Sequence, residues 1–492
     1  MQWSFRLSFV FLFIVQLGCS QSAKKSTYQA LFQAYENYWE TSIQDRRFKH
    51  RDIESLILNL KSPFQVNELG QSIEGRPIYS VSIGTGPTKV LLWSQMHGDE
   101  PTATMALMDI FNFFESNDQF DRLRQKILKE LTLVFVPMLN PDGAERYARR
   151  NALGVDLNRD ALRLQTPEAK ILKTIRDELD ADWGFNLHDQ SRYYSAGSSK
   201  NTAAISFLAP AFNHQKDINT VRGNSMKLIV HMNDILQKYI PGSVAKYNDT
   251  FEPRAFGDNI QKWGTSTILI EAGAYPNDPE KQFLRKLHFV ILLSSFESIA
   301  KKAYQKENIK KYRQLPFNRS SRFMDLLLRE VQIKRRGNWY TVDLGFRRQE
   351  IELGQATDFY HQASLSDLGD LSVYQAYNDH KLNDFKAVSA RTYDRTLNHW
   401  SELAQFDPIQ LLEDGITSIP VRNRTFSFPL SQLPIQMVGE KDNVRNEAIL
   451  GQNPSFLLQK NGQTRFIVTN GQIFDLQNDR ERIRNLWNQL FH

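Results

Sequence analysis

The chain has 492 residues, of which 41% are hydrophobic and 24% are charged. This composition is typical of a globular protein. The length predicts two domains, because a chain of this length rarely folds around a single hydrophobic core. The net charge of +6 is small for this length and the basic residues are scattered, which argues against nucleic-acid binding.

The first residues have the pattern of an export signal. Arg6 precedes an apolar run from Leu7 to Leu17, which is too short to span a bilayer comfortably and has the shape of a secretory signal. Cys19 is the only cysteine, so no disulfide forms within the chain. The segment resembles a bacterial lipoprotein signal, with residues 1–18 removed and Cys19 acylated. We therefore expect export to the cell envelope or periplasm and a lipid anchor in the membrane, with a plain cleaved signal as the alternative.

Strands and helices alternate through the first part of the chain. We expect a tether and a helix within residues 19–62 and a catalytic domain over residues 63–310. The expected elements are helix 27–44, strands 64–70, 76–84 and 89–96, helix 102–114, strand 131–139, helix 166–179, strand 182–189, helix 219–240, strand 265–273 and helix 278–304. This alternation predicts an α/β fold with a mixed, mostly parallel, doubly wound sheet and helices on both faces.

The alternation of strand and helix patterns ends at about residue 310. Residues 320–492 are expected to form a β-rich C-terminal domain. Residues 325–346 and 455–476 read as β-hairpins, and the second carries two Asn-Gly turn signals. The histidines of this domain have no ligand-like spacing. An interaction or substrate-guiding module and a purely structural cap are both open as its role.

The chemistry-bearing residues follow strand ends of the α/β domain, where the ligand crevice of such a sheet lies. His97 and Glu100, in "HGDE", follow the strand 89–96, and His188 ends the strand 182–189. Two imidazoles and a carboxylate are a catalytic zinc ligand set that leaves one position open for water. An isolated histidine at a strand end would instead be an ordinary structural residue. The joint placement of all three favours a metal site with one zinc ion.

A general base and a cationic loop complete this set. Glu271 ends the almost wholly apolar strand 265–273, where an unused carboxylate would be costly to bury; a salt-bridge partner is the alternative reading. The loop 140–160 carries four arginines. Within it Asn158 and Arg159 can clamp a carboxylate, and a second arginine could stabilise an oxyanion.

In chain order, "HGDE", "NPDG", "RRNALGVDLNRD", "NLHD" and "ILIEAG" resemble the zinc carboxypeptidases of the M14 family, over roughly residues 60–305. The resemblance implies that His97, Glu100 and His188 bind zinc and that Glu271 is the general base. It implies that Asn158 and Arg159 hold the C-terminal carboxylate of a peptide substrate.

Further roles follow from the same resemblance. It places the oxyanion arginine at Arg149, with Arg150 as the alternative assignment. The tyrosine that covers the bound residue is Tyr247, which lies two residues farther from Glu271 than the family spacing. The side-chain pocket draws on residues 252–259, where Arg254 would favour an acidic residue and Asp258 a basic one.

We therefore expect an enzyme, a zinc metallocarboxypeptidase that hydrolyses the C-terminal amide bond of peptides with a free C-terminus. The nearest alternative keeps the chemistry and acts on peptidoglycan peptides next to a diamino acid. A non-catalytic binding protein on the same fold is the third reading. The sequence leaves the oligomeric state open.

Overall fold

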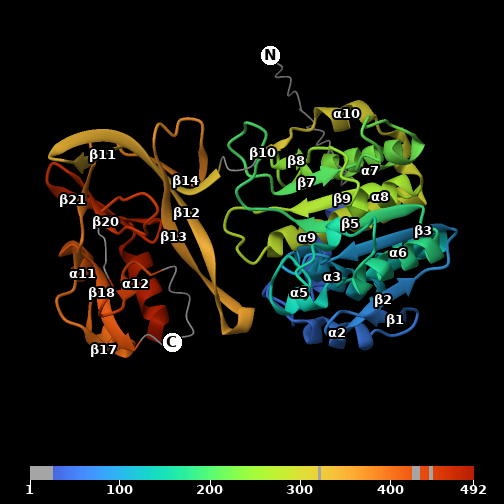
Figure 1. Cartoon of the computed structure of the whole chain (residues 1–492), viewed down its shortest axis with the longest axis horizontal. Coiled ribbons are helices and arrows are strands. Elements are labelled where there is room, and N and C mark those ends of the chain that lie inside the picture. Colours follow the sequence, from blue (N-terminus) through green and yellow to red (C-terminus); the bar gives the residue numbers. More distant parts are fainter. Residues whose placement is uncertain (1–25, 320–322, 424–432, 443–446, 492) are drawn as a thin grey trace, which may run out of the picture.

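An eight-stranded mixed sheet forms the centre of the first domain in this computed structural model, which describes residues 26–319, 323–423, 433–442 and 447–491 (Figure 1). The strand order is β1-β2-β4-β3-β5-β9-β7-β8. The four strands β4, β3, β5 and β9 run parallel at its centre, and antiparallel pairs flank them. The strands are β1 (Gln65–Gln71), β2 (Pro77–Ile83), β3 (Thr88–Ser94), β4 (Leu131–Val136), β5 (Trp183–Asp189), β7 (Ile205–Leu208), β8 (Val244–Lys246) and β9 (Ser266–Ala272).

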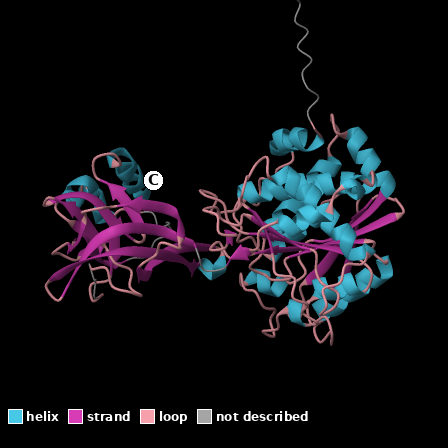
Figure 2. Cartoon of the chain, turned by 90° about the horizontal axis from the view of Figure 1, so that it is seen from above, coloured by secondary structure: helices cyan, strands magenta, loops and turns pink. Residues whose placement is uncertain are grey.

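Helices cover both faces of this sheet (Figure 2). They are α1 (Thr27–Ala34), α2 (His50–Leu58), α3 (Thr102–Glu115), α4 (Asp121–Glu130), α5 (Pro141–Glu145), α6 (Pro167–Leu179), α7 (Thr220–Leu236), α8 (Phe256–Lys262), α9 (Gln282–Ala300) and α10 (Ile309–Gln314). The predicted start of α6 is confirmed, since Thr166 Oγ1 accepts from Ala169 N and Pro167 holds the first helical position. The expected α/β class with helices on both faces is thereby confirmed.

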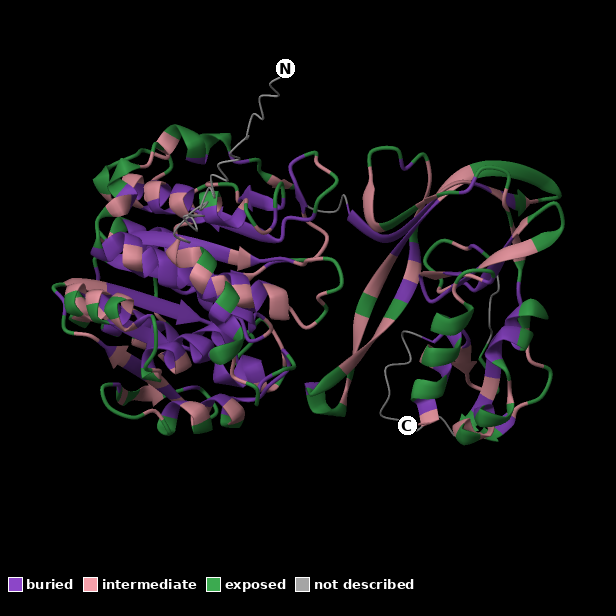
Figure 3. Ribbon diagram, turned by 180° about the vertical axis from the view of Figure 1, so that it is seen from behind, coloured by how far each residue is buried: buried purple, intermediate pink, exposed green. Residues whose placement is uncertain are grey.

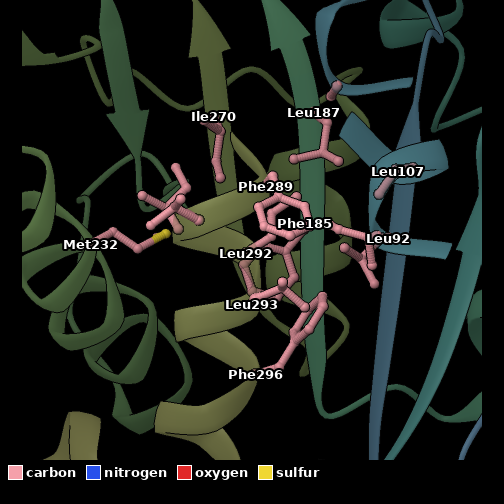
Figure 4. Close-up of a cluster of buried hydrophobic side chains, with 14 of the residues drawn as sticks. Leu92, Leu107, Phe185, Leu187, Met232, Ile270, Phe289, Leu292, Leu293 and Phe296 are labelled. Carbon is pink, nitrogen blue, oxygen red and sulfur yellow. The ribbon is translucent and has the colours of Figure 1, made fainter. Parts of the chain in front are cut away.

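The central strands are apolar because both of their faces are buried. In β3, Val90 and Leu92 face the core shared with α3, α7 and α9, whereas Leu91 and Trp93 face the core shared with α6 and α8. Figure 4 shows Leu92 in the first of these cores, with Phe185 of β5 among side chains of α9. Figure 3 shows the same burial along the sheet.

The N-terminal helix is shorter than predicted. The sequence pattern predicts one helix over residues 27–44, but α1 ends at Ala34 and a single 3-10 turn extends only to Asn37. Beyond this point Glu40 is held in a non-helical path, because its backbone N–H donates to Asp109 and its carbonyl accepts from Arg285. Leu31 of α1 and Ile53 of α2 lie in the core of the sheet domain.

That path depends on a buried ion pair between α3 and α9. Asp109 and Arg285 are both fully buried, and Arg285 Nε lies 2.7 Å from Asp109 Oδ2. The Tyr35 hydroxyl also donates to Asp109, at 2.9 Å. A buried charge left without its partner is strongly destabilising, so this pair fixes the N-terminal segment onto the domain.

The C-terminal domain is β-rich, as expected. Its larger sheet has the order β13-β12-β11-β15-β20-β21-β22, with β14 on β11, and a smaller sheet contains β16, β18, β17 and β19. Its strands are β11 (Phe323–Arg335), β12 (Asn338–Leu353), β13 (Asp358–Gly369), β14 (Gln375–Lys381), β15 (Lys386–Ser389), β16 (Arg391–Thr392), β17 (Leu397–His399), β18 (Ile416–Asn423), β19 (Gln436–Val438), β20 (Phe456–Lys460), β21 (Gln463–Thr469) and β22 (Gln472–Asp475). Helices α11 (Pro408–Glu413) and α12 (Arg480–Asn488) pack on the smaller sheet, and β6 (Ser195–Ala196) pairs with β10 (Asn318–Arg319) where the two domains join.

The expected signal segment and Cys19 lie outside the described residues, so the lipid anchor stays a prediction that incorporation of labelled fatty acid at Cys19 would test. Among the residues that the structure describes, none of the helices is both long and apolar enough to span a membrane.

The Asp109–Arg285 pair gives a stability prediction. We expect Arg285→Met to lower the free energy of unfolding of the first domain by about 3–5 kcal/mol, because it leaves the Asp109 carboxylate buried and unpaired. The double variant Asp109→Leu with Arg285→Met should lose less than the sum of the two single changes. Urea unfolding measures both, and Lys126→Ala, at the exposed pair with Glu130, should cost below about 0.5 kcal/mol. Additive losses in the double variant would contradict the assignment.

Candidate metal centre and active site

The carboxyl ends of three parallel strands bring the predicted residues together. His97 follows β3, His188 lies near the end of β5, and Glu271 lies near the end of β9. His188 and Glu271 are direct neighbours in the parallel register of β5 and β9. Glu100 lies on the turn between β3 and α3, so four side chains from three separate segments of the chain meet at one edge of the sheet.

Glu100 lies between the two histidines. Its Oε1 is 2.8 Å from His97 Nδ1, and its Oε2 is 2.6 Å from His188 Nδ1. The three side chains are buried, and their candidate ligand atoms all lie within 4.8 Å of one another. Two imidazole nitrogens and one carboxylate form a zinc donor set of the catalytic type. The residues present therefore fit one zinc ion.

Burial and mutual contact set the protonation of this cluster. Burial alone would lower the pKa of His97, but the carboxylates of Glu100 and Asp156 outweigh it and raise that pKa to about 9. Burial also opposes ionisation of Glu100, but His97 and His188 hold its pKa well below the usual range. Burial lowers the pKa of His188, which favours its neutral, metal-binding form.

Two glycines allow the "HGDE" and "NPDG" turns to touch. A Cβ on Gly98 would lie 1.9 Å from the carbonyl carbon of Gly143, so only glycine fits at Gly98 without displacing that backbone. Asn140 caps α5 by accepting from Gly143 N at 2.9 Å, and its amide donates to Met96 O at 3.2 Å. This contact fixes the arginine-rich loop against the strand end that carries His97.

Asp156 is the residue that sequence reasoning missed. Its Oδ1 is 3.0 Å from His97 Nε2, and its Oδ2 accepts from Arg149 Nη2 at 3.0 Å. Oδ1 also accepts from Asn158 N at 3.0 Å. A carboxylate on the second nitrogen of a metal-binding histidine fixes its tautomer and orientation. A carboxylate just before "LNR" was a signal that could have identified it.

The structure places Arg149, rather than Arg150, beside the histidines. Arg149 Nη1 is 3.2 Å from Glu100 Oε1 and 3.1 Å from His97 Nδ1. Arg150 is exposed, and its Nη1 donates to Gly154 O at 2.9 Å. Only the first guanidinium is therefore positioned to act on a group bound at the cluster.

Asn158 and Arg159 lie on the same loop, directly after Asp156. Asn158 is buried, and its Oδ1 accepts from Phe256 N at 2.9 Å. Arg159 Nε lies 3.7 Å from Glu252 Oε2. The sequence placed Glu252 only within the pocket segment 252–259 and gave it no role of its own. The side-chain amide and the guanidinium are thus held by contacts from the segment that precedes and begins α8.

The two candidates for side-chain selectivity differ in exposure. Arg254 is exposed and forms an ion pair with Glu252 at 3.0 Å. Asp258 is buried, its Oδ1 accepts from Glu252 N at 3.1 Å, and burial raises the pKa of its carboxyl to about 7. Asp258 points inward and Arg254 outward, whereas the selectivity of either residue stays a prediction.

Tyr247 follows β8 and lies close to the cluster. Burial raises the pKa of its hydroxyl, and the nearby Glu271 carboxylate raises it further. The ring of Tyr194 packs edge-on against it, with the centroids 5.9 Å apart. Burial and the Glu100 carboxylate likewise raise the pKa of Glu271 well above its usual value.

Part of the chain is similar in sequence to known zinc carboxypeptidases. Residues 53–227 match the family described as zinc carboxypeptidase, Peptidase M14. Carboxypeptidase SOL1 of Arabidopsis thaliana is 33% identical over 126 residues, which is 22% of this chain and 26% of that protein. Carboxypeptidase D of Mus musculus is 28% identical over 137 residues, which is 24% of this chain and 10% of that protein. The chain thus spans about a quarter or less of the length of these relatives.

Among solved structures, a metallo-carboxypeptidase from Burkholderia cenocepacia is similar, with a TM-score of 0.41 and 17% identity. That likeness covers 52% of this chain and 70% of the other chain.

The contact between Asp156 and His97 gives a prediction about metal binding. We expect Asp156→Asn to weaken zinc binding about 10–100-fold, because the imidazole loses the carboxylate that orients it. Competition with a chromophoric chelator measures the affinity. Asp177→Asn, on the exposed face of α6, is the matched control and should bind zinc as the unaltered protein does. Equal affinity in both variants would show that Asp156 does not support the ligand.

Proposed function

We propose that the chain is a zinc carboxypeptidase of the M14 family, whose model matches residues 53–227, and that it removes the C-terminal residue of peptides by hydrolysis. The observation that carries this proposal is the buried cluster of His97, Glu100 and His188, with Glu271 beside it in the strand register. A non-catalytic protein would not need a base, a metal donor set and a positioned arginine at one strand edge.

In this proposal, His97, His188 and Glu100 would hold one zinc ion, and the imidazole Nδ1 atoms that face the Glu100 carboxylate are its candidate donors. Zinc bound by three protein side chains polarises a carbonyl group and lowers the pKa of water. The donor distances and the burial of these three residues support the assignment.

Glu271 acts as the general base. Its carboxylate takes a proton from the attacking water and then gives this proton to the leaving amine. Burial and the Glu100 carboxylate raise the pKa of Glu271, which makes its carboxylate more basic than that of an exposed glutamate. The position of Glu271 next to His188 supports this role.

The loop that contains Asp156 binds the substrate. Arg149 donates to the oxyanion that develops on the scissile carbonyl, and Asp156 holds its guanidinium on the opposite side. Asn158 and Arg159 hold the terminal carboxylate of the peptide, which sets the cut one residue from the end. Tyr247 covers the bound residue.

The central test is digestion of a peptide library that contains both ordinary peptides and cell-wall peptides with a diamino acid. We expect products that lack one C-terminal residue, loss of cleavage with a chelator and recovery with zinc, all read by mass spectrometry. Glu271→Gln should lower kcat about 10²–10⁴-fold, because the base is removed. Internal cleavage, or cleavage that a chelator does not affect, would overturn the proposal.

A second test separates the two neighbouring arginines. Arg149→Ala should lower kcat about 10²–10³-fold, or about 2.7–4 kcal/mol of transition-state stabilisation, because an oxyanion donor is lost. Arg150→Ala is the matched control, since its guanidinium contacts only the Gly154 carbonyl in the described structure. Thermal unfolding and zinc content should be unchanged in both. Full turnover in Arg149→Ala, with loss in Arg150→Ala, would reverse the assignment.

A further inference from the structure

A cleft of about 1350 Å³ lies between the two domains, and the candidate active site forms part of its wall. Glu100 and Arg149 line it from the first domain. Arg348, His361 and Tyr377 line it from the C-terminal domain. A peptide that reaches the metal ligands through this cleft therefore contacts both domains.

The β12–β13 hairpin holds one side of the cleft (Figure 1). Glu350 of β12 forms ion pairs with Arg46 and Arg47 of the first domain. The guanidinium of Arg47 lies between the rings of Tyr147 and Phe359, 4.0 and 4.7 Å from their centroids. Ion pairs and stacking at one point fix the tip of the hairpin on the first domain.

The loop after β5 holds the other side of the cleft. Arg192, four residues after His188, forms an ion pair with Asp325 at 2.7 Å. The Tyr193 hydroxyl lies 2.6 Å from Asp325 Oδ2, and the Tyr377 hydroxyl donates to Arg192 O at 2.7 Å. The wall that the C-terminal domain provides is therefore tied to the strand that carries a metal ligand.

Among the cationic residues that line the cleft, Arg348 differs from the others in its ion pairing. The guanidinium of Arg348 forms no ion pair within 4.0 Å among the described residues, whereas each of the other side chains does; the nearby Asp325 carboxylate accepts from the backbone N–H of Arg348 at 2.8 Å. The other pairs are Arg46 with Glu350, Arg149 with Asp156, Arg192 with Asp325, Lys281 with Asp189, and Arg482 with Asp479.

The guanidinium of Arg348 is also short of hydrogen bonds. Its Nη2 donates to Gly471 O at 2.8 Å, but its buried Nε has no partner among the described residues. Burial lowers the pKa of Arg348; the Asp325 carboxylate opposes this shift and the positive charge of Arg192 adds to it. Asp325 is already paired with Arg192, so the Arg348 guanidinium has no ion-pair partner of its own among the described residues, and a carboxylate matches a guanidinium in shape and charge.

We propose that Arg348 binds a carboxylate side chain of the substrate on the N-terminal side of the scissile bond, an inference that rests on the proposed peptidase function. Asn158 and Arg159, which hold the terminal carboxylate in that function, are not among the described residues that line the cleft. The remainder of the peptide therefore extends from Arg149 into the cleft, toward the C-terminal domain. Arg348 makes the enzyme selective for acidic peptides.

The test compares pentapeptides with the same C-terminal residue and either Glu or Gln at each of the three positions before the scissile bond. At one of these positions we expect the full-length zinc-loaded enzyme to favour Glu by about tenfold or more in kcat/KM, as a charge-assisted hydrogen bond gives. Arg348→Gln should abolish this preference through KM, Arg348→Lys should keep part of it, and Arg348→Glu should reverse it toward Lys-containing peptides. An N-blocked dipeptide with a free C-terminus and no acidic side chain should be cleaved at the same rate by all four proteins.

Arg395→Gln is the matched control, because Arg395 is exposed on the C-terminal domain and contacts the Tyr393 hydroxyl. It should leave the Glu preference unchanged, and thermal unfolding checks that each variant is folded. Equal Glu-to-Gln ratios in the unaltered enzyme and Arg348→Gln, with cleavage intact, would overturn this inference alone. Failure to cleave any peptide would overturn the proposed function, and this inference with it.

Discussion

The buried carboxylate of Glu100 is the constraint around which the rest of the site is arranged. A charge in this position is costly unless it is fully compensated, and four groups contact it: two imidazoles, the Arg149 guanidinium and the backbone N–H of Asp189. These groups come from two separate strand ends and one loop. The fold therefore has to bring β3, β5 and the arginine loop to one point before Glu100 can be buried.

Asp156 contacts two of the groups that surround Glu100, namely His97 and Arg149. It compensates His97 and Arg149 from the side opposite Glu100, and it starts the turn that carries Asn158. In the proposed function, metal binding, oxyanion stabilisation and substrate positioning would thereby be linked through one carboxylate. A loop without helix or strand periodicity can hold catalytic groups accurately because each of them is bonded to a neighbour that is itself fixed.

The α/β core and the clustering of the candidate metal ligands could be predicted from sequence for one physical reason. Strands buried on both faces are continuous apolar runs, and the polar residues that end such parallel strands gather at one edge of the sheet. His188 and Glu271 are of this kind. Asp156 and Glu252 are not, because their importance depends on which partner the folded loop presents to them.

The position of the C-terminal domain was beyond prediction for the same reason. Its main contacts join residues such as Arg47 and Glu350, which are 303 positions apart and have no local pattern in common. The early end of α1 likewise follows from a tertiary contact, the Asp109–Arg285 pair, which overrides the helical pattern of the segment. Local pattern thus predicts the sheet and its strand ends, and charge pairing between distant segments determines the remainder.

The most direct test of the account is to locate zinc in crystals of the full chain by anomalous scattering at the zinc edge. The account predicts one peak per chain, at about 2.0–2.2 Å from His97 Nδ1, His188 Nδ1 and a Glu100 carboxylate oxygen. A zinc-loaded crystal with no peak at these three residues, or with its strongest peak at another cluster, would contradict it.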